Sequence, residues 1–152
     1  MLSGERGYDL RLDWARGRAF QVVPAESAAR IPAADIPRLA AALKEFSGGS
    51  AIAVNIDVTD ERGDAFDVQI GPEGLTEVNR ELGLYRFLLT REDEPWAIAC
   101  NEWYNLFAAP AELLTELLGG TLEEARAEFQ VYADRLGGSL PDVAALYREP
   151  AS

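Results

Sequence analysis

Apolar and polar residues alternate along several stretches in the middle of the chain, and this period-two pattern predicts β-strands. The clearest cases are 51–58 and 65–70, which are separated by a charged loop over 59–63. Further strands are predicted over 84–90 and 96–100, with a second charged turn between them. Because short turns join antiparallel strands, the middle of the chain is predicted to be an antiparallel β-meander of at least four strands.

The N-terminal part of the chain carries a similar pattern. Apolar and polar residues alternate over 8–14, and a second apolar segment covers 18–23. Gly17 suits the turn between these segments, and Pro24 is predicted to end the second one because it has no amide hydrogen to donate. We therefore expect an N-terminal β-hairpin. The segment 75–82 fits either a short helix or a strand, and the sequence leaves both open.

Four other segments have apolar residues at helical spacing. One helix is predicted over 35–46, where a proline lies in the first turn and a glycine pair follows the end. Three more are predicted over 110–118, 121–136 and 139–147. The second of these begins with the pattern Thr-x-x-Glu, in which a hydroxyl and a carboxylate satisfy the first free amides of a helix.

The order of these elements, strands followed by helices, indicates an α+β fold. The length of 152 residues suits one domain, so 1–152 is predicted to be a single α+β domain. Antiparallel sheets commonly bury one face and expose the other, so we expect the helices to pack on one face of the meander. The residues expected to form this contact are Leu39, Leu43, Phe46, Leu117, Phe129 and Leu136.

The balance of charge restricts the partners. The chain has 26 acidic and 14 basic side chains, a formal net charge of −12. Such a chain repels nucleic acid and anionic lipid, so neither is predicted as a partner, whereas a basic protein is. The chain has no apolar stretch of the roughly 18 residues that a membrane helix needs, and no signal-peptide pattern. A cytoplasmic location is therefore expected.

The residue types present exclude several kinds of active site. The chain has no histidine and one cysteine, which rules out Ser-His-Asp and Cys-His catalysis and zinc sites built from histidine or four cysteines. Cys100 is predicted to be a buried, unreactive thiol. The acidic run from Asp57 to Asp67 lacks the spacing of a calcium loop, so no metal and no cofactor are predicted. A carboxylate pair formed by Glu102 with Asp57 or Asp67 is the remaining route to an enzyme.

Two groups of residues are candidates for binding a partner. The first is the acidic turn, Glu92, Asp93 and Glu94, and the second is Glu102 with the aromatic residues Trp103 and Tyr104. Carboxylates attract a basic partner from a distance, and large aromatic side chains often anchor interfaces. The same two aromatic residues suit a protein core equally well, because their polar atoms find partners there.

In size, charge and order of elements the chain is similar to immunity proteins, which neutralise bacterial toxins, and to type III secretion chaperones. No motif assigns it to either family. Such chaperones usually open with a helix, so the expected N-terminal hairpin favours an immunity protein. The sequence thus predicts a non-enzymatic acidic binding module that neutralises a basic toxin. A secretion chaperone and a small carboxylate-dependent enzyme or ligand-binding domain are the alternatives.

Overall fold

A computed structural model of the protein describes residues 10–27, 31–56, 64–82 and 86–148. Six strands form one antiparallel sheet in the order β1-β6-β5-β4-β2-β3. The strands are β1 (Gln21–Glu26), β2 (Ser50–Asn55), β3 (Asp64–Gln69), β4 (Phe87–Thr90), β5 (Ala97–Cys100) and β6 (Tyr104–Ala109). The predicted α+β class and the antiparallel sheet are confirmed.

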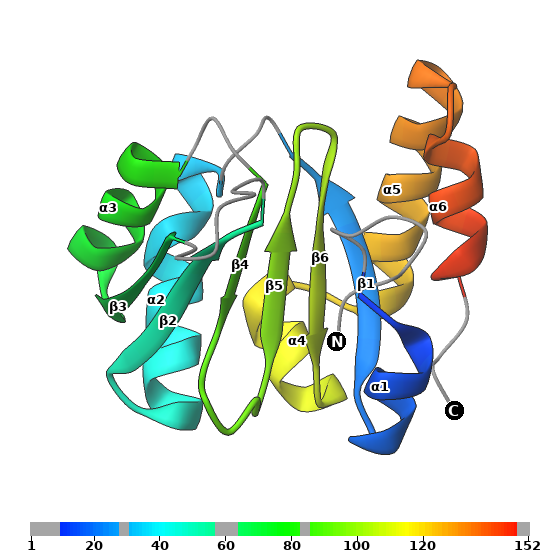
Figure 1. Ribbon diagram of the computed structural model, residues 1–152. Helices are drawn as coiled ribbons and strands as arrows, with labels where there is room; N and C mark the ends of the chain where they lie inside the picture. Colours follow the sequence, from blue (N-terminus) through cyan, green and yellow to red (C-terminus); the bar gives the residue numbers. More distant parts are fainter. Residues whose placement is uncertain (1–9, 28–30, 57–63, 83–85, 149–152) are drawn as a thin grey trace.

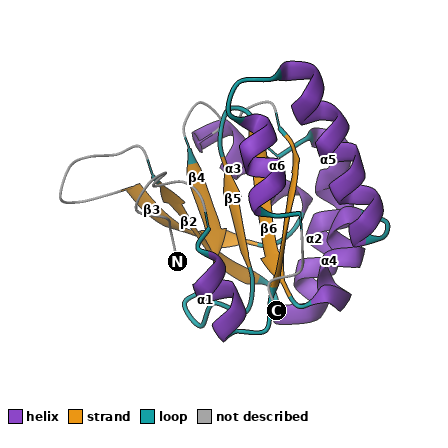
Figure 2. Cartoon of the chain, turned by 90° about the vertical axis from the view of Figure 1, so that its right-hand side faces the viewer, coloured by secondary structure: helices purple, strands orange, loops and turns teal. Residues whose placement is uncertain are grey.

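Helices cover both faces of this sheet and one of its edges (Figures 1 and 2). They are α1 (Leu12–Gly17), α2 (Ile36–Ser47), α3 (Pro72–Leu82), α4 (Ala111–Leu118), α5 (Leu122–Leu136) and α6 (Leu140–Leu146), with a short 3-10 turn at Ala33–Asp35. Within the described ranges, every helix is too short or too polar to span a bilayer.

Strand residues point alternately to the two faces and divide between two apolar clusters. In β5, for example, Ile98 and Cys100 join the cluster under α2, α3 and α4, while Ala97 and Ala99 join the one under α1, α5 and α6. The expectation that all helices pack on one face is therefore wrong. The reason is that β4, β5 and β6 are mostly apolar and are buried at every position, so both of their faces must be covered.

The predicted N-terminal hairpin is also wrong, because Leu12–Gly17 forms the helix α1. Two residues of this region, Leu10 and Ala15, are buried in the second cluster. A first hairpin strand would have to pair with the free edge of β1, but α5 runs along β1 instead (Figure 2). The segment therefore buries its apolar residues as a helix, although its alternating pattern predicts a strand.

Pro24 lies inside β1 and does not end it. It is opposite Leu106 of β6, the single strand that pairs with β1. A proline is tolerated there because an edge strand has one side that donates no hydrogen bonds to the sheet. The strand consequently extends to Glu26, which places that carboxylate at the end of the sheet.

The order of strands departs from a simple meander. The run β4, β5, β6 is a meander, but β2 pairs with both β3 and β4, so the chain passes from β3 to β4 through α3. The ambiguous segment 75–82 is part of that helix. The sequence analysis did not predict β6, because all six of its residues are buried and it shows no alternation. The predicted loop at 59–63 lies outside the described residues.

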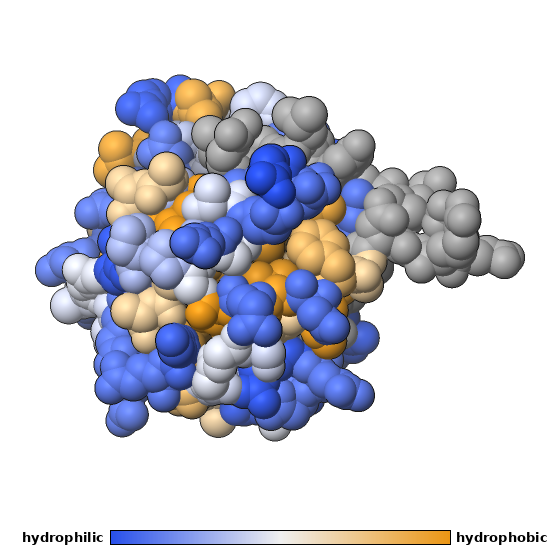
Figure 3. Space-filling model, turned by 90° about the vertical axis from the view of Figure 1, so that its left-hand side faces the viewer, coloured by the Kyte–Doolittle hydropathy of each residue, from blue (hydrophilic) through white to orange (hydrophobic). Residues whose placement is uncertain are grey.

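Of the six residues expected in the core, four are buried and two are exposed. Phe46 is 46% exposed near the end of α2, and Leu136 is 50% exposed at the end of α5. Phe129 is buried, but in the cluster opposite to that of Leu39 and Leu117. Figure 3 shows the β3 and α3 side of the molecule, where hydrophilic atoms surround a small apolar area.

Candidate binding site

The six predicted binding residues lie at opposite ends of the sheet. Glu92, Asp93 and Glu94 belong to the turn between β4 and β5, whereas Glu102 and Trp103 belong to the turn between β5 and β6. Strand β5 separates the two turns (Figure 1). The residues therefore form two separate surfaces.

Most charges of the acidic turn already have partners. The carboxylate of Glu94 forms an ion pair with Arg18, whose guanidinium also donates to the carbonyl oxygens of Asp93 and Glu94 at 3.3 and 2.9 Å. Asp93 forms an ion pair with Arg91 at 3.2 Å. Of the three acidic residues, Glu92 alone has no ion pair with another described residue. The charge that this turn offers to a partner is thus smaller than the sequence suggests.

The turn between β5 and β6 presents an aromatic ring on a fixed backbone. Trp103 is 57% exposed. Its amide donates to Oδ1 of Asn101 at 2.9 Å, and its carbonyl oxygen accepts from the hydroxyl of Tyr132 at 2.6 Å. The amide of Tyr104 donates to the same Oδ1 at 3.1 Å. The amide and the carbonyl oxygen of Trp103 are therefore both hydrogen-bonded to side chains, while its indole is exposed to solvent.

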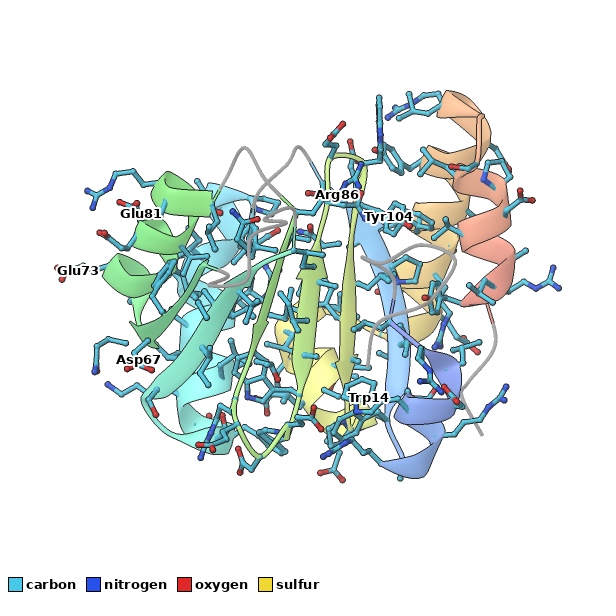
Figure 4. The ribbon with its side chains drawn as sticks, viewed as in Figure 1. Trp14, Asp67, Glu73, Glu81, Arg86 and Tyr104 are labelled. Carbon is cyan, nitrogen blue, oxygen red and sulfur yellow. The ribbon has the colours of Figure 1, made fainter. Side chains whose placement is uncertain are left out.

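Tyr104 is part of the core. It is 2% exposed and meets the ring of Phe129 edge-on, with centroids 6.1 Å apart. Figure 4 shows it on the side of the sheet near α5, far from Asp67 and Glu73 on the opposite side. The sequence left open whether these two aromatic residues lie in the core or at a binding surface. Tyr104 lies in the core, and Trp103 lies at the surface.

Next to this turn lies a pocket of about 480 Å³, which we call the Asn105 pocket. It opens between the end of β1, the start of β6 and the helices α2, α4 and α5. Phe107, Leu117, Ala125 and Phe129 form part of its apolar wall. Its polar lining consists of Glu26, Ser27, Asp35, Arg38, Asn105 and Glu128. A volume of this size is within the usual range for small-molecule sites, roughly 300–1,000 Å³.

Asn105 is the unusual member of this lining. It is 1% exposed, and neither its side-chain oxygen nor its side-chain nitrogen has a hydrogen-bonding partner among the described residues. Its neighbours across the sheet, Cys100 and Ala25, supply no polar side-chain partner of their own. Leaving a buried polar group unpaired costs about 1–3 kcal/mol, so such groups in native proteins call for an explanation.

Negative charge dominates the Asn105 pocket. Among the described residues of its lining, Arg38 carries the one guanidinium, which pairs with Asp35 at 3.0 Å and donates to the carbonyl oxygen of Leu117 at 2.9 Å. The other two carboxylates, on Glu26 and Glu128, form no ion pair with any residue that the structure describes. The pocket is therefore suited to a group that brings positive charge and hydrogen-bond donors.

Glu26 connects the pocket to the Trp103 turn. Burial raises the pKa of the Tyr132 hydroxyl, and the negative charge of Glu26 raises it further, while Arg135 acts in the opposite direction. This hydroxyl is the one that donates to the Trp103 carbonyl. Tyr132 thus interacts both with the carboxylate in the pocket and with the backbone of the residue that carries the exposed indole.

The routes to an enzyme that the sequence left open receive no support from the geometry. Asp67 is exposed on the edge strand β3, which β2 and β4 separate from β5 and the turn that holds Glu102, and Asp57 lies outside the described residues. Burial raises the pKa of the Cys100 thiol well above its usual range, which disfavours the nucleophilic thiolate. The described residues contain no group of three or more acidic or cysteine side chains placed to hold a metal ion.

The sequence analysis missed Glu26, Asn105 and Glu128, the residues that distinguish the Asn105 pocket. One signal was present: Asn105 interrupts the otherwise apolar run from Tyr104 to Ala109. Recognising it required knowing that this run is a buried strand. The two glutamates gave no signal, because they are 102 positions apart and resemble any other surface carboxylate.

A scan against protein-family models, a search of curated proteins and a search of solved structures each find no match for the chain.

Proposed function

We propose that the protein is a non-enzymatic binding module that recognises a basic protein partner through the Trp103 turn. The observation that carries the proposal is the exposed indole of Trp103 on a backbone held by Asn101 and Tyr132. An aromatic side chain that is fixed before binding loses little conformational freedom when a partner covers it. Tryptophan is also among the residues most enriched at the energetic centres of interfaces.

Charge supports a basic partner. Glu102 adjoins Trp103 and is exposed, the negative charge of Glu26 acts on the Tyr132 hydroxyl that holds the Trp103 backbone, and the whole chain carries a net charge of −12. Complementary charge speeds the association of two proteins, and this effect weakens as salt screens exposed charges. Glu92 and its neighbours, at the other end of the sheet, add to this long-range attraction without touching a partner that is bound at Trp103.

Neutralisation of a basic toxin, the activity of immunity proteins, is one form of this proposal. The reason for preferring it to a secretion chaperone was the expected opening hairpin, and Leu12–Gly17 is a helix instead. The acidic composition fits both families equally. The nature of the captured partner, a toxin or a secreted protein, therefore distinguishes these two forms of the proposal.

The partner is to be isolated from the native host with the tagged protein, and its binding kinetics are then measured for single variants. Trp103→Ala is expected to speed dissociation about 30-fold, because an anchoring residue contributes 2 kcal/mol or more. The matched control is Phe46→Ala, which removes another exposed aromatic ring, from the far end of α2. That variant should dissociate at the wild-type rate.

Charge variants test the other half of the proposal. Glu102→Lys should both slow association and speed dissociation, whereas Glu92→Lys, in the turn at the other end of β5, should slow association alone. The proposal fails if the partner is acidic, or if association is equally fast at about 50 mM and about 500 mM salt. It also fails if Phe46→Ala weakens binding more than Trp103→Ala does.

A further inference from the structure

The Asn105 pocket holds three features whose combination the fold alone does not require. The buried amide of Asn105 has no hydrogen-bonding partner among the described residues, two carboxylates have no ion pair with any of those residues, and an apolar wall lies beside them. Folding would be served better by a leucine than by an unpaired asparagine at this position. The asparagine therefore points to a molecule that enters the pocket and bonds to it.

Charge narrows the class of that molecule. The charge of Arg38 is already balanced by Asp35, and its Nε donates to the carbonyl oxygen of Leu117. Glu26 and Glu128 also line the pocket, and both are exposed carboxylates without an ion pair to a described residue. A ligand with a cationic nitrogen group satisfies both carboxylates and also donates to Oδ1 of Asn105.

The apolar wall narrows the class further. Phe107 and Phe129 line the same pocket, and both are almost fully buried. A short alkyl chain attached to the cation would pack against these rings, whereas a bare metal ion would leave them uncovered. The described residues also offer no group of three ligands for a metal.

We propose that the Asn105 pocket binds the alkylguanidinium or alkylammonium group of a small basic ligand. Glu26 and Glu128 neutralise the cation, the Asn105 oxygen accepts one of its protons, and Phe107 and Phe129 enclose the alkyl chain. The inference concerns the pocket alone and stands whether or not a protein binds the Trp103 turn. A free basic metabolite and an arginine or lysine side chain of another protein share this chemistry.

The first experiment compares a cation with a neutral molecule of the same shape. The purified, isotope-labelled protein is titrated with n-butylguanidinium and, separately, with n-butylurea, and amide signals are followed by nuclear magnetic resonance. The cation should shift the side-chain NH2 signal of Asn105 and leave the backbone signal of Glu92 unchanged. The neutral urea should bind at least tenfold more weakly. If the urea binds as well as the cation, or if neither shifts Asn105, the proposal is wrong.

Substitutions in the lining then assign the roles. Glu128→Gln should weaken the binding of n-butylguanidinium about tenfold, while Glu123→Gln, an exposed glutamate on the same helix outside the pocket, should leave it unchanged. Equal effects of the two variants would show that general electrostatic attraction suffices, and would overturn the proposal. Because Glu128 is exposed, its substitution tests binding without risk to the fold.

Asn105→Leu separates a binding role from a structural one. This variant should have a higher melting temperature, because an unpaired buried amide is removed. It should also bind n-butylguanidinium at least tenfold more weakly. A lowered melting temperature together with unchanged affinity would show that the amide serves the fold and not a ligand. A variant that is more stable but binds the cation more weakly indicates that the native residue serves binding at a cost to stability.

The final comparison distinguishes the two sources of the ligand. N-acetylarginine methylamide carries the same guanidinium on a peptide-like backbone. Binding at least tenfold tighter than that of n-butylguanidinium identifies an arginine side chain of another protein as the ligand. Binding at least tenfold weaker identifies a free small cation, because the capped backbone is then excluded from the pocket.

Discussion

At the scale of single residues, burial decides which polar and ionisable groups are able to act. Cys100 lies between Phe87 and Asn105 in the sheet, is 1% exposed, and has its pKa raised by burial. Trp103, in contrast, projects a large apolar ring into solvent while its backbone is fixed. The thiol is thus enclosed, as the sequence predicted, and Trp103, which the sequence left open between core and surface, is exposed to a partner.

The buried thiol predicts how stability changes in alkaline solution. In the unfolded chain Cys100 ionises near its ordinary pKa of about 8.5, while in the folded protein it keeps its proton. The unfolded state therefore binds fewer protons above this pH, and the free energy of unfolding should fall by up to about 1.4 kcal/mol per pH unit. Denaturant melts between pH 8 and pH 10 measure this slope, and Cys100→Ala should flatten it.

A thiol reagent supplies the control for this prediction. Native protein should react with it far more slowly than protein in denaturant, because the thiol is enclosed. Comparable rates in the two conditions would contradict the assigned burial.

At the scale of elements, contacts between neighbouring segments override local preference. Helix α3 packs so closely on β3 that a Cβ atom on Gly74 would lie 1.7 Å from the carbonyl oxygen of Gln69 and 2.8 Å from its carbon. The sequence pattern of this segment allowed a strand as readily as a helix. A glycine in its first turn, where the two elements approach most closely, allows the helix to pack on the sheet.

Gly74→Ala should therefore destabilise the protein, although alanine is the better helix former. The backbone of Gln69 cannot move aside as a flexible side chain would, so we expect a loss of about 3 kcal/mol, at the upper end of the range for overpacking. Thr76→Ala, at an exposed position of the same helix, is the control and should change stability by less than about 0.5 kcal/mol. Denaturant melts measure both, and equal stability of the two variants would show that α3 does not approach β3 so closely.

At the scale of the whole molecule, negative charge is the dominant property. The chain carries 26 acidic side chains against 14 basic ones. Several of the ion pairs between described residues join neighbours in the sequence on exposed surface, such as Arg80 with Glu77, and pairs of this kind contribute little to stability. Repulsion between the remaining carboxylates opposes the compact state.

Added salt should consequently stabilise the protein. Raising sodium chloride from about 20 mM to about 300 mM shortens the range of electrostatic interactions from about 20 Å to about 6 Å, which weakens repulsion between distant carboxylates. The melting temperature should rise over this range. A fall would show that attractive ion pairs outweigh the repulsion, and would remove the charge argument for a basic partner.

Local pattern predicted much of the architecture correctly. The amphipathic periods of 35–46 and 121–136 located α2 and α5, and Thr121 caps α5 by accepting a hydrogen bond from the amide of Glu124 at 3.1 Å. The alternation of 51–58 and 65–70 located β2 and β3. These elements follow from the sequence because one side of each faces the core and the other faces water. The spacing of their apolar residues therefore shows whether each is a helix or a strand.

Tertiary structure alone decided the rest. Strand β6 is buried on both faces and so has no alternation to read, and α1 replaced a predicted strand because α5 covers the edge that the strand needed. The Asn105 pocket joins Glu26 and Glu128, which are far apart in the chain and meet because α5 returns along β1. The periodic pattern of a segment shows which of its residues face the core and which face solvent. Which distant side chains meet depends on how the covered surfaces fit together, and no local pattern contains that information.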